Sequence, residues 1–572
     1  MKRRDFLHIS GTASLISTGI ILPDILYAKP SFSEFSNFSE LVGNLIQLND
    51  ERIPDLMKMQ DLNQQSKYFG GVQDNFKIFN PGSTSGLITV FTCAFCSSQS
   101  KFFRDEKLAE SIELAIKYLL KIQHTDGTID LLSTNFHSTP DTGFVVEPLC
   151  AAFKLLSEAQ FERKKGVIEL LEKFLKNAGE ALIVGGIHTP NHRWVVSMAL
   201  ARLNSLFPDE RYLKRINEWL REGIDIDNDG QYEERSTYIY TPLTNRCLVT
   251  IAKLAGKKEL LDPVRKNLEM TMFYIHPNGE IATEASGRQD QFQVGYMEHY
   301  YLPLRFMAIN DKNPRFSALL KQIEQTVPEK LAGYLIYFLE DKTYFSPLPS
   351  PLSLPDNYTK EFPHSKLVRI RKGNIDASVL GGNPAFFTLS KGNAGLASVR
   401  LASAFFGKGQ FKSGIVEKSG DSFILKWQFH WGYFQPLPEN QKPNYEIPFD
   451  EDRKRRRPSE RQRLQAQITV TEKEGIFELN FELEGTENVP LAIELAFRKG
   501  GILTGTEKLN DPGTYLFKEN SGKYSIENDT IEFGPGKAEH AWTAIRGGLP
   551  KPDGDCVYIT GFTPFSHKLK IG

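Results

Sequence analysis

The spacing of apolar residues changes once along this 572-residue chain, near Pro363, and that change limits the fold more than any other feature. Before it, large apolar residues recur three and four positions apart, as in 108–120 and 195–206, which predicts amphipathic helices. After it, short segments such as 367–371 and 475–483 alternate or stay apolar between turn residues, which predicts antiparallel strands. Helices first and strands second indicate two domains rather than an α/β fold.

Turn signals divide the helical half at intervals of roughly fifty residues, the length of two helices and two loops. The helical half is therefore predicted to be a series of αα-hairpins, an (α/α) toroid or solenoid. We expect the toroid at residues 29–346, a proline-rich linker at 347–363 and a meandering antiparallel β domain at 364–572. The turn signals are Asp126-Gly127, Gly185-Gly186, Asp229-Gly230 and Asn278-Gly279.

The first 28 residues have the pattern of an export signal. Arg3 and Arg4 precede a short apolar stretch at 11–22, and the small residue Ala28 follows it. The paired arginines look like a twin-arginine signal, and the apolar stretch is too short for a stable membrane span. We expect a mature protein without membrane insertion in the periplasm, with a retained N-terminal anchor as the alternative.

The charge balance and the cysteine content exclude several classes of protein. A formal net charge of −1 argues against a nucleic-acid-binding protein, which needs a surplus of Lys and Arg. Five cysteines are too few for a disulfide scaffold, and Cys93 and Cys96 are expected to be a buried pair. The basic run at 453–457 is interpreted as a solvated loop, because acidic residues precede it, or as a surface that attracts an anionic polymer.

Several histidines lie beside the turn signals of the helical half. If the hairpins form a ring, these loops share one end of it and their residues converge on one cavity. His137 stands on the loop side of a predicted helix start, where Ser138 or Asp141 can be the cap. The set is His124, His137, His188, His192, His276 and His299.

The segment 185–194 carries the densest group of candidate residues. Thr189 and Pro190 are a favourable helix start, which places Asn191, His192 and Arg193 in the first turn. The helix N-terminus favours an anion such as a carboxylated substrate, and it keeps a nearby imidazole neutral and able to act as a base. The predicted substrate-binding residues here are Asn191, Arg193, Trp194 and His188.

The segment 225–242 opens like a calcium loop, but Ser236 stands where the bidentate glutamate belongs. A tight turn that presents Tyr232 and the substrate-binding candidate Glu233 is the simpler interpretation. Tyr238 and Tyr240 are two residues apart, so an extended segment would place both on one side.

Arg288, in the turn segment 278–290, is a candidate for binding a carboxylate bidentately, with a surface ion pair as the alternative. Together with a neutral histidine and tyrosines, it suits β-elimination at a uronic acid. Asn191 or Arg288 would stabilise the carboxylate as it gains enolate character, and His192 or a tyrosinate would take the C5 proton. Tyr238 or Tyr240 would protonate the departing O4. This chemistry requires no metal and no organic cofactor.

The layout and these segments resemble the heparinase II/III-like and alginate-lyase-like families. The features that carry the resemblance are the signal, the hairpin repeat, the β domain, Asn191-His192 and the tyrosine-rich segment. The resemblance implies an (α/α) toroid followed by an antiparallel β-sandwich, with elimination chemistry on uronate-containing glycans. The chain also looks like exo-acting relatives, β-glucuronidases and ulvan oligosaccharide dehydratases, which implies an acidic, ulvan-type substrate.

The sequence leaves two questions open: which residue is the base, and whether the enzyme is a lyase or a glycosidase. His137, His188 and His192 are more crowded than in heparinase-like lyases, which leaves the base undecided. A glycosidase would instead need two carboxylates, about 5–5.5 Å apart if retaining and about 6.5–9.5 Å if inverting. A non-catalytic binding protein would leave the loop histidines and tyrosines unexplained. The carboxylates available to a glycosidase are Asp141, Glu147, Glu233 and Glu284.

Overall fold

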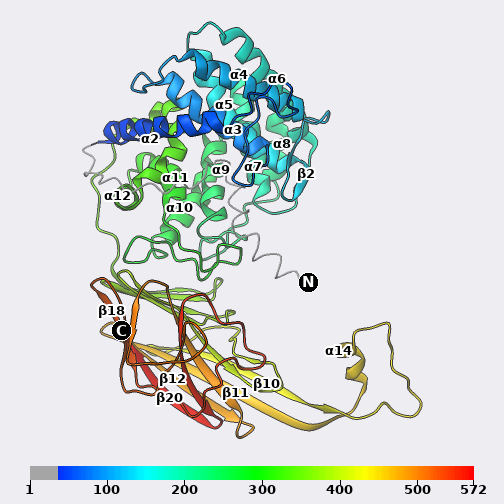
Figure 1. The fold of residues 1–572 in the computed structure, drawn as a ribbon, viewed down its shortest axis with the longest axis vertical. Helices are drawn as coiled ribbons and strands as arrows, with labels where there is room; N and C mark the ends of the chain where they lie inside the picture. The colour runs from blue at the N-terminus through cyan, green and yellow to red at the C-terminus, as the bar shows by residue number, and fades with distance from the viewer. Residues whose placement is uncertain (1–36) are drawn as a thin grey trace. The chain divides into compact units, whose positions relative to one another are not determined.

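The computed structural model describes residues 37–572, so the predicted signal at 1–28 lies outside the described residues. Within them the chain forms two compact units (Figure 1). The helical unit extends to Met272 and includes Gly279–Leu354, and the β unit contains Phe273–Asn278 and Pro355–Gly572. None of the helices in residues 37–572 is long and apolar enough to cross a membrane.

The helical unit is a double layer of helices. In the inner layer, each helix packs against the next and most of its residues are buried. The inner helices are α3 (Pro81–Cys96), α5 (Thr139–Glu158), α7 (His192–Leu206), α9 (Tyr240–Leu254) and α11 (Tyr301–Asp311). The outer helices are amphipathic: α4 (Glu106–Ile122), α6 (Lys164–Val184), α8 (Glu210–Leu220), α10 (Leu261–Thr271) and α12 (Pro314–Thr326). This alternation confirms the predicted toroid of αα-hairpins.

The remaining elements of this unit are shorter or lie at its ends. Helix α3 contains no charged residue, which explains why it can be buried on all sides. In α3, Cys93 is buried and Cys96 is half-buried, and both thiols are free. Burial raises the pKa of the Cys96 thiol to about 12. The elements are α2 (Phe38–Met59), α13 (Leu335–Glu340), the two-stranded β1 (Ile129–Leu131) and β2 (Asn135–Ser138), and short 3₁₀ turns.

The turn glycines repeat a single packing arrangement. Gly127, Gly230 and Gly279 have φ angles of 85°, 98° and 86°, in the left-handed region that favours glycine. Each lies against an outer helix: Gly127 against α6, Gly230 against α10 and Gly279 against α12. These glycines lie 103 and 49 residues apart, about two periods and one period of the predicted repeat. The intervening turn signal, Gly185-Gly186, has no left-handed angle and does not share this arrangement.

Replacing Gly127 by alanine is expected to lower the free energy of unfolding by about 2 kcal/mol or more. The new Cβ would lie 2.0 Å from the carbonyl oxygen of Asn177, in addition to the strain of the left-handed backbone. Urea unfolding followed by circular dichroism measures the change. Gly166→Ala is the control, because Gly166 lies within α6 with open space around it, and alanine there should be neutral or stabilising. Equal stability of the two variants would contradict this account.

The β unit is a sandwich of two sheets. One has the order β14-β17-β18-β20-β12-β11-β10-β9, and the other has the order β15-β16-β19-β13-β7-β6-β5-β4-β3, with β8 paired to β7. The strand pairs are antiparallel apart from β16 with β19. Alternate residues of β12, such as Phe477, Leu479 and Phe481, face the shared core. This confirms the antiparallel β-sandwich.

The strands have the following bounds. The first half contains β3 (Asn357–Phe362), β4 (Leu367–Lys372), β5 (Ile375–Leu380), β6 (Phe387–Lys391), β7 (Ala394–Ser403), β8 (Gly409–Gln410), β9 (Glu417–Ser419) and β10 (Ser422–Phe434). The second half contains β11 (Pro458–Lys473), β12 (Ile476–Gly485), β13 (Pro490–Phe497), β14 (Ile502–Thr504), β15 (Glu507–Lys508), β16 (Thr514–Leu516), β17 (Gly522–Ile526), β18 (Asp529–Gly534), β19 (Asp555–Phe562) and β20 (Phe565–Ile571).

The boundary differs from the predicted linker at 347–363 in two ways. Residues 357–362 form strand β3, because this proline-free stretch can donate and accept the hydrogen bonds of a sheet edge. Residues 273–278 belong to the β unit, although they precede Gly279 of the helical unit. The carbonyl of Phe273 accepts hydrogen bonds from Tyr358 and Arg369, both at 3.2 Å. His276 Nδ1 lies 3.0 Å from Asp376, which ties the same segment to strand β5.

Candidate functional site

The candidate site begins at the N-terminus of α7. The helix starts at His192 with Asn191 as its N-cap residue, not at Thr189-Pro190 as predicted. Thr189 instead donates a hydrogen bond from Oγ1 to Asn191 Oδ1, at 2.8 Å. The amide oxygen is thereby fixed, and Asn191 Nδ2 is buried without a hydrogen-bond partner in the described part of the chain. A buried amide donor with no partner is costly, which marks it as a group that a ligand can satisfy.

His192 is buried beside it, with a relative exposure of 8 %. Its ring meets those of His188 and Phe144 edge to face, with centroids 4.7 Å and 6.3 Å away. Its Nδ1 also has no hydrogen-bond partner within residues 37–572. Burial, with the charges of His188 and Arg288, lowers the pKa of His192 to about 3. The imidazole is therefore neutral, as predicted, but burial is the main cause rather than the helix terminus.

The His192 pKa predicts a pH dependence of stability. Between about pH 6.5 and pH 3 the unfolded chain binds a proton at His192 that the folded chain does not, so stability falls as the pH decreases. His192→Gln should remove this component, worth roughly 2–3 kcal/mol between pH 6.5 and 4.5. Urea unfolding of both proteins at the two pH values measures it, and an identical loss in both would contradict the assignment.

An ion pair between a buried carboxylate and a partly exposed arginine lies next to this helix terminus. Glu234 Oε2 is 2.9 Å from Arg288 Nη1, and the backbone N–H of Asn191 donates to the Glu234 carboxylate. Burial raises the pKa of Glu234, and the Arg288 charge opposes that rise. The structure thus uses Glu234 here, whereas the predicted Glu233 is exposed. Arg288 is held in place by this pair, and its side chain remains 37 % exposed.

Tyr240 connects this ion pair to the next segment. It is the first residue of α9, and its backbone N–H donates to Ser236 Oγ at 3.1 Å. The Arg288 guanidinium lies over its ring, 5.2 Å from the centroid. Gln289 Nε2 donates to its hydroxyl oxygen at 2.5 Å. An amide donor and a cation thus face the hydroxyl group and the ring of Tyr240.

Tyr238 points to a different group, which corrects the prediction that the two tyrosines share one side. Residues 237–239 form a turn rather than an extended strand. The Tyr238 hydroxyl donates to Glu298 Oε1 at 3.0 Å, and Lys330 Nζ is 2.9 Å from the same oxygen. Burial raises the pKa of Glu298, but the charges of His299 and Lys330 outweigh it and hold the pKa below its ordinary value.

Hydrogen bonds join the tyrosine segment to the loop after Gly279. Asp290 accepts from the backbone N–H of Tyr238 and from Ser286 Oγ, both at 3.1 Å. The N–H of Gly287 donates to the carbonyl of Arg235 at 2.7 Å. Because of these contacts, segments about fifty residues apart in sequence hold Arg288 and Gln289 against Tyr240.

Three predicted residues beside His192 have other surroundings. Trp194 is fully buried, and its indole N–H donates to Asp225 at 3.0 Å. Arg193 pairs with Asp225 and Glu222, both at 3.1 Å, so its charge is already compensated. We therefore assign both to the support of the loop rather than to substrate contact. His188 is exposed beside His192.

The loop at 225–230 forms the predicted tight turn. Gly230 N–H donates to the carbonyl of Asp227, but Tyr232 is buried and donates to Asn245 instead of being presented. The Asp225 carboxylate, the first acidic residue of the calcium-like motif, is bound by Arg193 and Trp194. Within residues 37–572, no group of three or more His, Cys, Asp or Glu side chains is placed to hold a metal ion.

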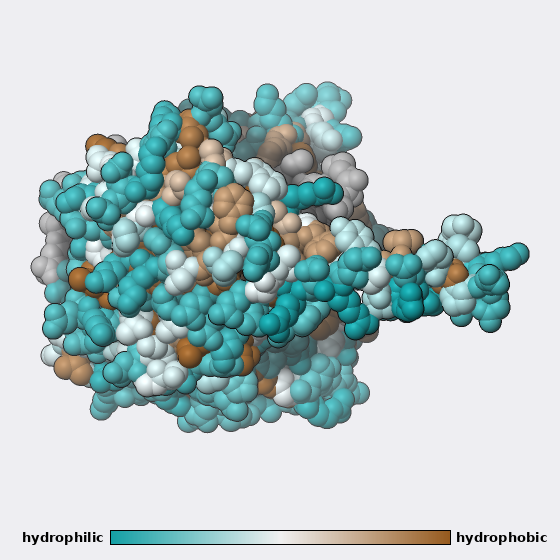
Figure 2. Space-filling view, turned by 90° about the horizontal axis from the view of Figure 1, so that it is seen from below, coloured by the Kyte–Doolittle hydropathy of each residue, from teal (hydrophilic) through white to brown (hydrophobic). Residues whose placement is uncertain are grey.

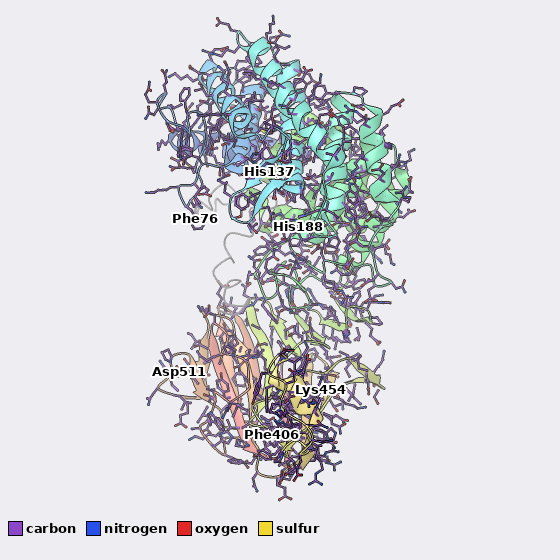
Figure 3. All side chains as sticks on the ribbon, turned by 90° about the vertical axis from the view of Figure 1, so that its right-hand side faces the viewer. Phe76, His137, His188, Phe406, Lys454 and Asp511 are labelled. Carbon is purple, nitrogen blue, oxygen red and sulfur yellow. The ribbon has the colours of Figure 1, made fainter. Side chains whose placement is uncertain are left out.

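His137 lies on strand β2, just before α5, and Figure 3 labels it together with His188 on the helical unit. It is exposed, its Nδ1 is 2.7 Å from Asp126, and its ring stacks on His124 at 3.7 Å. Ser138 caps α5 as predicted, since its hydroxyl accepts from the N–H of Asp141. The start of α5, which follows the His137 strand, lies against the C-terminal end of α6, because a Cβ on Gly185 would collide with Thr139.

Two of the four carboxylates of the glycosidase alternative, Glu147 and Asp141, are engaged in structural contacts. Glu147 lies 3.2 Å from the Arg202 guanidinium and accepts from the Tyr337 hydroxyl. Asp141 accepts from Asn135 at 2.8 Å and from Ser138 at 2.5 Å, next to the helix cap. These partners keep both groups as structural carboxylates at the start and centre of α5.

No family model matches the sequence, and the comparison with curated proteins gives no match. Solved structures match in fold. Heparinase III is 12% identical, with 99% of this chain and 90% of that chain covered and a TM-score of 0.53. The chondroitin AC lyase of Streptomyces coelicolor A3, solved in complex with chondroitin sulphate, is 11% identical, with 99% and 82% covered and a TM-score of 0.53.

A xanthan lyase from Paenibacillus is 8% identical with a TM-score of 0.56, and the whole of this chain spans 60% of that longer one. These three structures are polysaccharide lyases in which an (α/α) toroid precedes a β-sandwich. The chain has this fold, as the sequence resemblance implied. At these identities the likeness concerns the fold, and the choice of chemistry depends on the site.

Proposed function

We propose that the protein is a carbohydrate-active lyase that performs β-elimination at a glucuronic-acid residue of an acidic, ulvan-type saccharide. The observation that carries this proposal is the pair of unpartnered buried nitrogens, Asn191 Nδ2 and His192 Nδ1, at the start of α7. Both lie beside the ion pair whose arginine covers Tyr240. A donor, a neutral base and a phenol beside an arginine are the groups that an elimination at a uronate requires.

The reaction removes the C5 proton and then breaks the bond from C4 to its oxygen. Asn191 Nδ2 donates to the substrate carboxylate, which takes negative charge as the C5–H bond breaks. We assign protonation of the departing O4 to the Tyr240 hydroxyl group. Gln289 and Arg288 would stabilise the negative charge that remains on the Tyr240 oxygen after the transfer. The electron pair of the C5–H bond forms the C4–C5 double bond.

His192 is our choice for the base that takes the C5 proton. In the free protein its low pKa keeps it neutral but makes it a weak base. A bound uronate places a negative charge nearby, and an opposite charge within a few ångströms raises the pKa of an imidazole. The substrate would therefore strengthen the base that acts on it. Tyrosinate formation at Tyr240 is the alternative for this step.

Two products distinguish the forms of this reaction. If a sugar is attached to O4, elimination cleaves the glycosidic bond and leaves a 4,5-unsaturated uronate. If the glucuronate is at the non-reducing end with a free 4-hydroxyl, the same step releases water, as in the dehydratases that the sequence resembles. The predicted export to the periplasm fits a substrate taken up as polymer or oligosaccharide.

The test is incubation with glucuronate-terminated ulvan oligosaccharides, followed by ultraviolet absorbance and mass spectrometry. A rise in absorbance indicates the unsaturated uronate, and loss of one water in mass identifies dehydration. Release of free glucuronate without a rise in absorbance would replace the proposal with the β-glucuronidase alternative.

A further inference from the structure

A two-stranded ribbon extends from one sheet of the β unit. Strands β10 and β11 pair from Ser422 to Phe434 of β10, but β9 pairs with β10 only at residues 422–424. Strand β12 follows β11 only as far as Leu464. Residues 427–434 and 458–463 therefore have no further strand partner among the described strands. With the connecting segment 435–457, which contains α14 (Phe449–Asp452), they project from the β unit (Figures 1 and 2). We call residues 427–463 the arm.

An aromatic ladder holds the base of the arm together. Trp427, Phe429 and Trp431 are alternate residues of β10 and stack nearly parallel, with centroids 6.0 Å and 5.5 Å apart. Lys408 Nζ and the Arg453 guanidinium lie 4.3 Å and 4.2 Å from the Trp431 ring centroid. An isolated two-stranded hairpin is marginally stable in water, so this ladder has a structural role.

The ladder and nearby ion pairs account for only part of the charge on the arm. Arg453 pairs with Asp450, and Arg455 and Arg456 pair with Asp452. The other lysines and arginines of the arm have no carboxylate partner anywhere in residues 37–572. They are Lys442, Lys454, Arg457, Arg461 and Arg463. The interpretation of the basic run as a solvated, self-compensated loop therefore explains only part of it.

Exposed aromatic rings accompany these free cations. Tyr433 is 62% exposed and meets Phe406 edge to face at 5.7 Å, and Tyr445 and Phe449 are 91% and 66% exposed. Figure 3 views the arm end-on and labels Phe406, which contacts Tyr433, and Lys454 of the basic run. Large rings exposed beside uncompensated cations are unusual on a surface that contacts only water.

We propose that the arm is a second binding surface for an acidic polysaccharide, separate from the site in the helical unit. Lys454, Arg457 and Arg461 contact carboxylate or sulfate groups, and exposed rings such as Tyr433 lie against sugar faces. The choice of a polysaccharide as the partner rests on the proposed function. The arm need add only modest affinity, because linked contacts strengthen the binding of long chains and leave short oligosaccharides unaffected.

Charge argues against the other partners that an aromatic, basic arm suggests. A two-fold interface with a second copy of this chain would bring like-charged surfaces together. A nucleic acid is bound through a broad positive field, whereas this chain has a net charge of −1. A polysaccharide with dispersed charges requires only a local cluster of cations.

The test compares two triple variants of the full-length chain. The arm variant carries Lys454→Gln, Arg457→Gln and Arg461→Gln. The control variant makes the same change in net charge at exposed lysines of the β unit outside the arm: Lys412→Gln, Lys473→Gln and Lys508→Gln. Affinity electrophoresis in gels containing ulvan or chondroitin sulfate measures binding, with neutral dextran as the reference polymer.

The arm variant is expected to bind the acidic polymers about tenfold or more weakly, and the control variant to bind them like the wild type. Tyr433→Ala should also weaken binding. The factor by which it weakens binding should not change with salt concentration, because the cations remain in place. Equal retardation of both triple variants would overturn the proposal. A wild-type dimer that the arm variant converts to a monomer, or equally strong binding of single-stranded DNA, would assign the arm to another partner and overturn it as well.

The measurements distinguish a failure of the arm assignment from a failure of the proposed function. If the ultraviolet product is absent but the arm variant loses polymer binding, the lyase assignment fails and the arm assignment stands. If the product forms equally well from polymer and from oligosaccharides in the arm variant, the lyase assignment stands and the arm assignment fails. Where both hold, the arm variant raises KM for the polymer, with kcat and the KM for short oligosaccharides unchanged.

Discussion

Tyr240→Phe is expected to lower kcat for formation of the unsaturated uronate by about 10²- to 10⁴-fold, the range for removal of a general acid or base. The substitution removes the one atom of Tyr240 that can transfer a proton and keeps the ring beneath the Arg288 guanidinium. The backbone hydrogen bond from Tyr240 to Ser236 is unaffected. KM should change little, because the hydroxyl is used in the proton transfer rather than in uniform binding of the substrate. Initial rates of ultraviolet absorbance on the ulvan oligosaccharides measure both constants.

Two further tyrosine variants show whether that loss of activity is specific to Tyr240. Tyr212→Phe, on the outer helix α8, is the matched control and should retain full activity. Tyr238→Phe removes the hydrogen bond to Glu298 and should reduce activity less than Tyr240→Phe, because its hydroxyl is already committed to that carboxylate. If Tyr238→Phe abolished activity while Tyr240→Phe did not, the roles of the two tyrosines would be exchanged. If both retained full activity, the site assignment would be wrong.

The sequence predicts the helical unit because its tight turns need left-handed backbone angles, and these angles favour glycine. Gly127, Gly230 and Gly279 adopt left-handed angles and lie against outer helices, so three of the four predicted turns can be located from glycine in the sequence. Residues 273–278 carry no such signal. They end one residue before Gly279, yet they hydrogen-bond to residues of the β unit nearly a hundred positions later. The periodicity of apolar residues predicts local elements and cannot predict a contact between residues so far apart in sequence.

The candidate site is predictable to the level of segments but not of side chains. Asn191, His192 and Arg288 are candidates from the sequence because helix starts and turns concentrate polar groups, and their roles in the reaction stay predictions. The sequence predicts Glu233 instead of Glu234, because the conformation of the turn decides which of two adjacent side chains faces Arg288. Gln289 is missed because a single glutamine forms no recognisable sequence motif. It belongs to the site only through its contact with Tyr240. Burial, which lowers the His192 pKa, is likewise a property of the packed helices.

Asn191→Ala is expected to lower kcat by about 10²- to 10³-fold, as for other preorganised donors to a developing anion. Asn191 Nδ2 is buried without a partner among residues 37–572, so its hydrogen-bonding capacity is unused in the free protein. An unused donor costs stability, and a substrate carboxylate that accepts from it recovers that cost. As the C5 proton leaves, charge grows on this carboxylate, and the bond strengthens in the transition state.

Stability measurements separate this role from a structural one. The Asn191 side chain makes no capping hydrogen bond to the α7 backbone, so Asn191→Ala should leave the free energy of unfolding unchanged or slightly increased. Thr189→Val keeps the amide but removes the hydroxyl that fixes Oδ1, and should therefore lower kcat by a smaller factor. Asn191→Asp preserves size but places a second carboxylate beside Glu234, and should repel the substrate and raise KM. A loss of stability in Asn191→Ala that matches its loss of activity would instead make Asn191 a structural residue, and the donor to the uronate would have to be sought at Arg288.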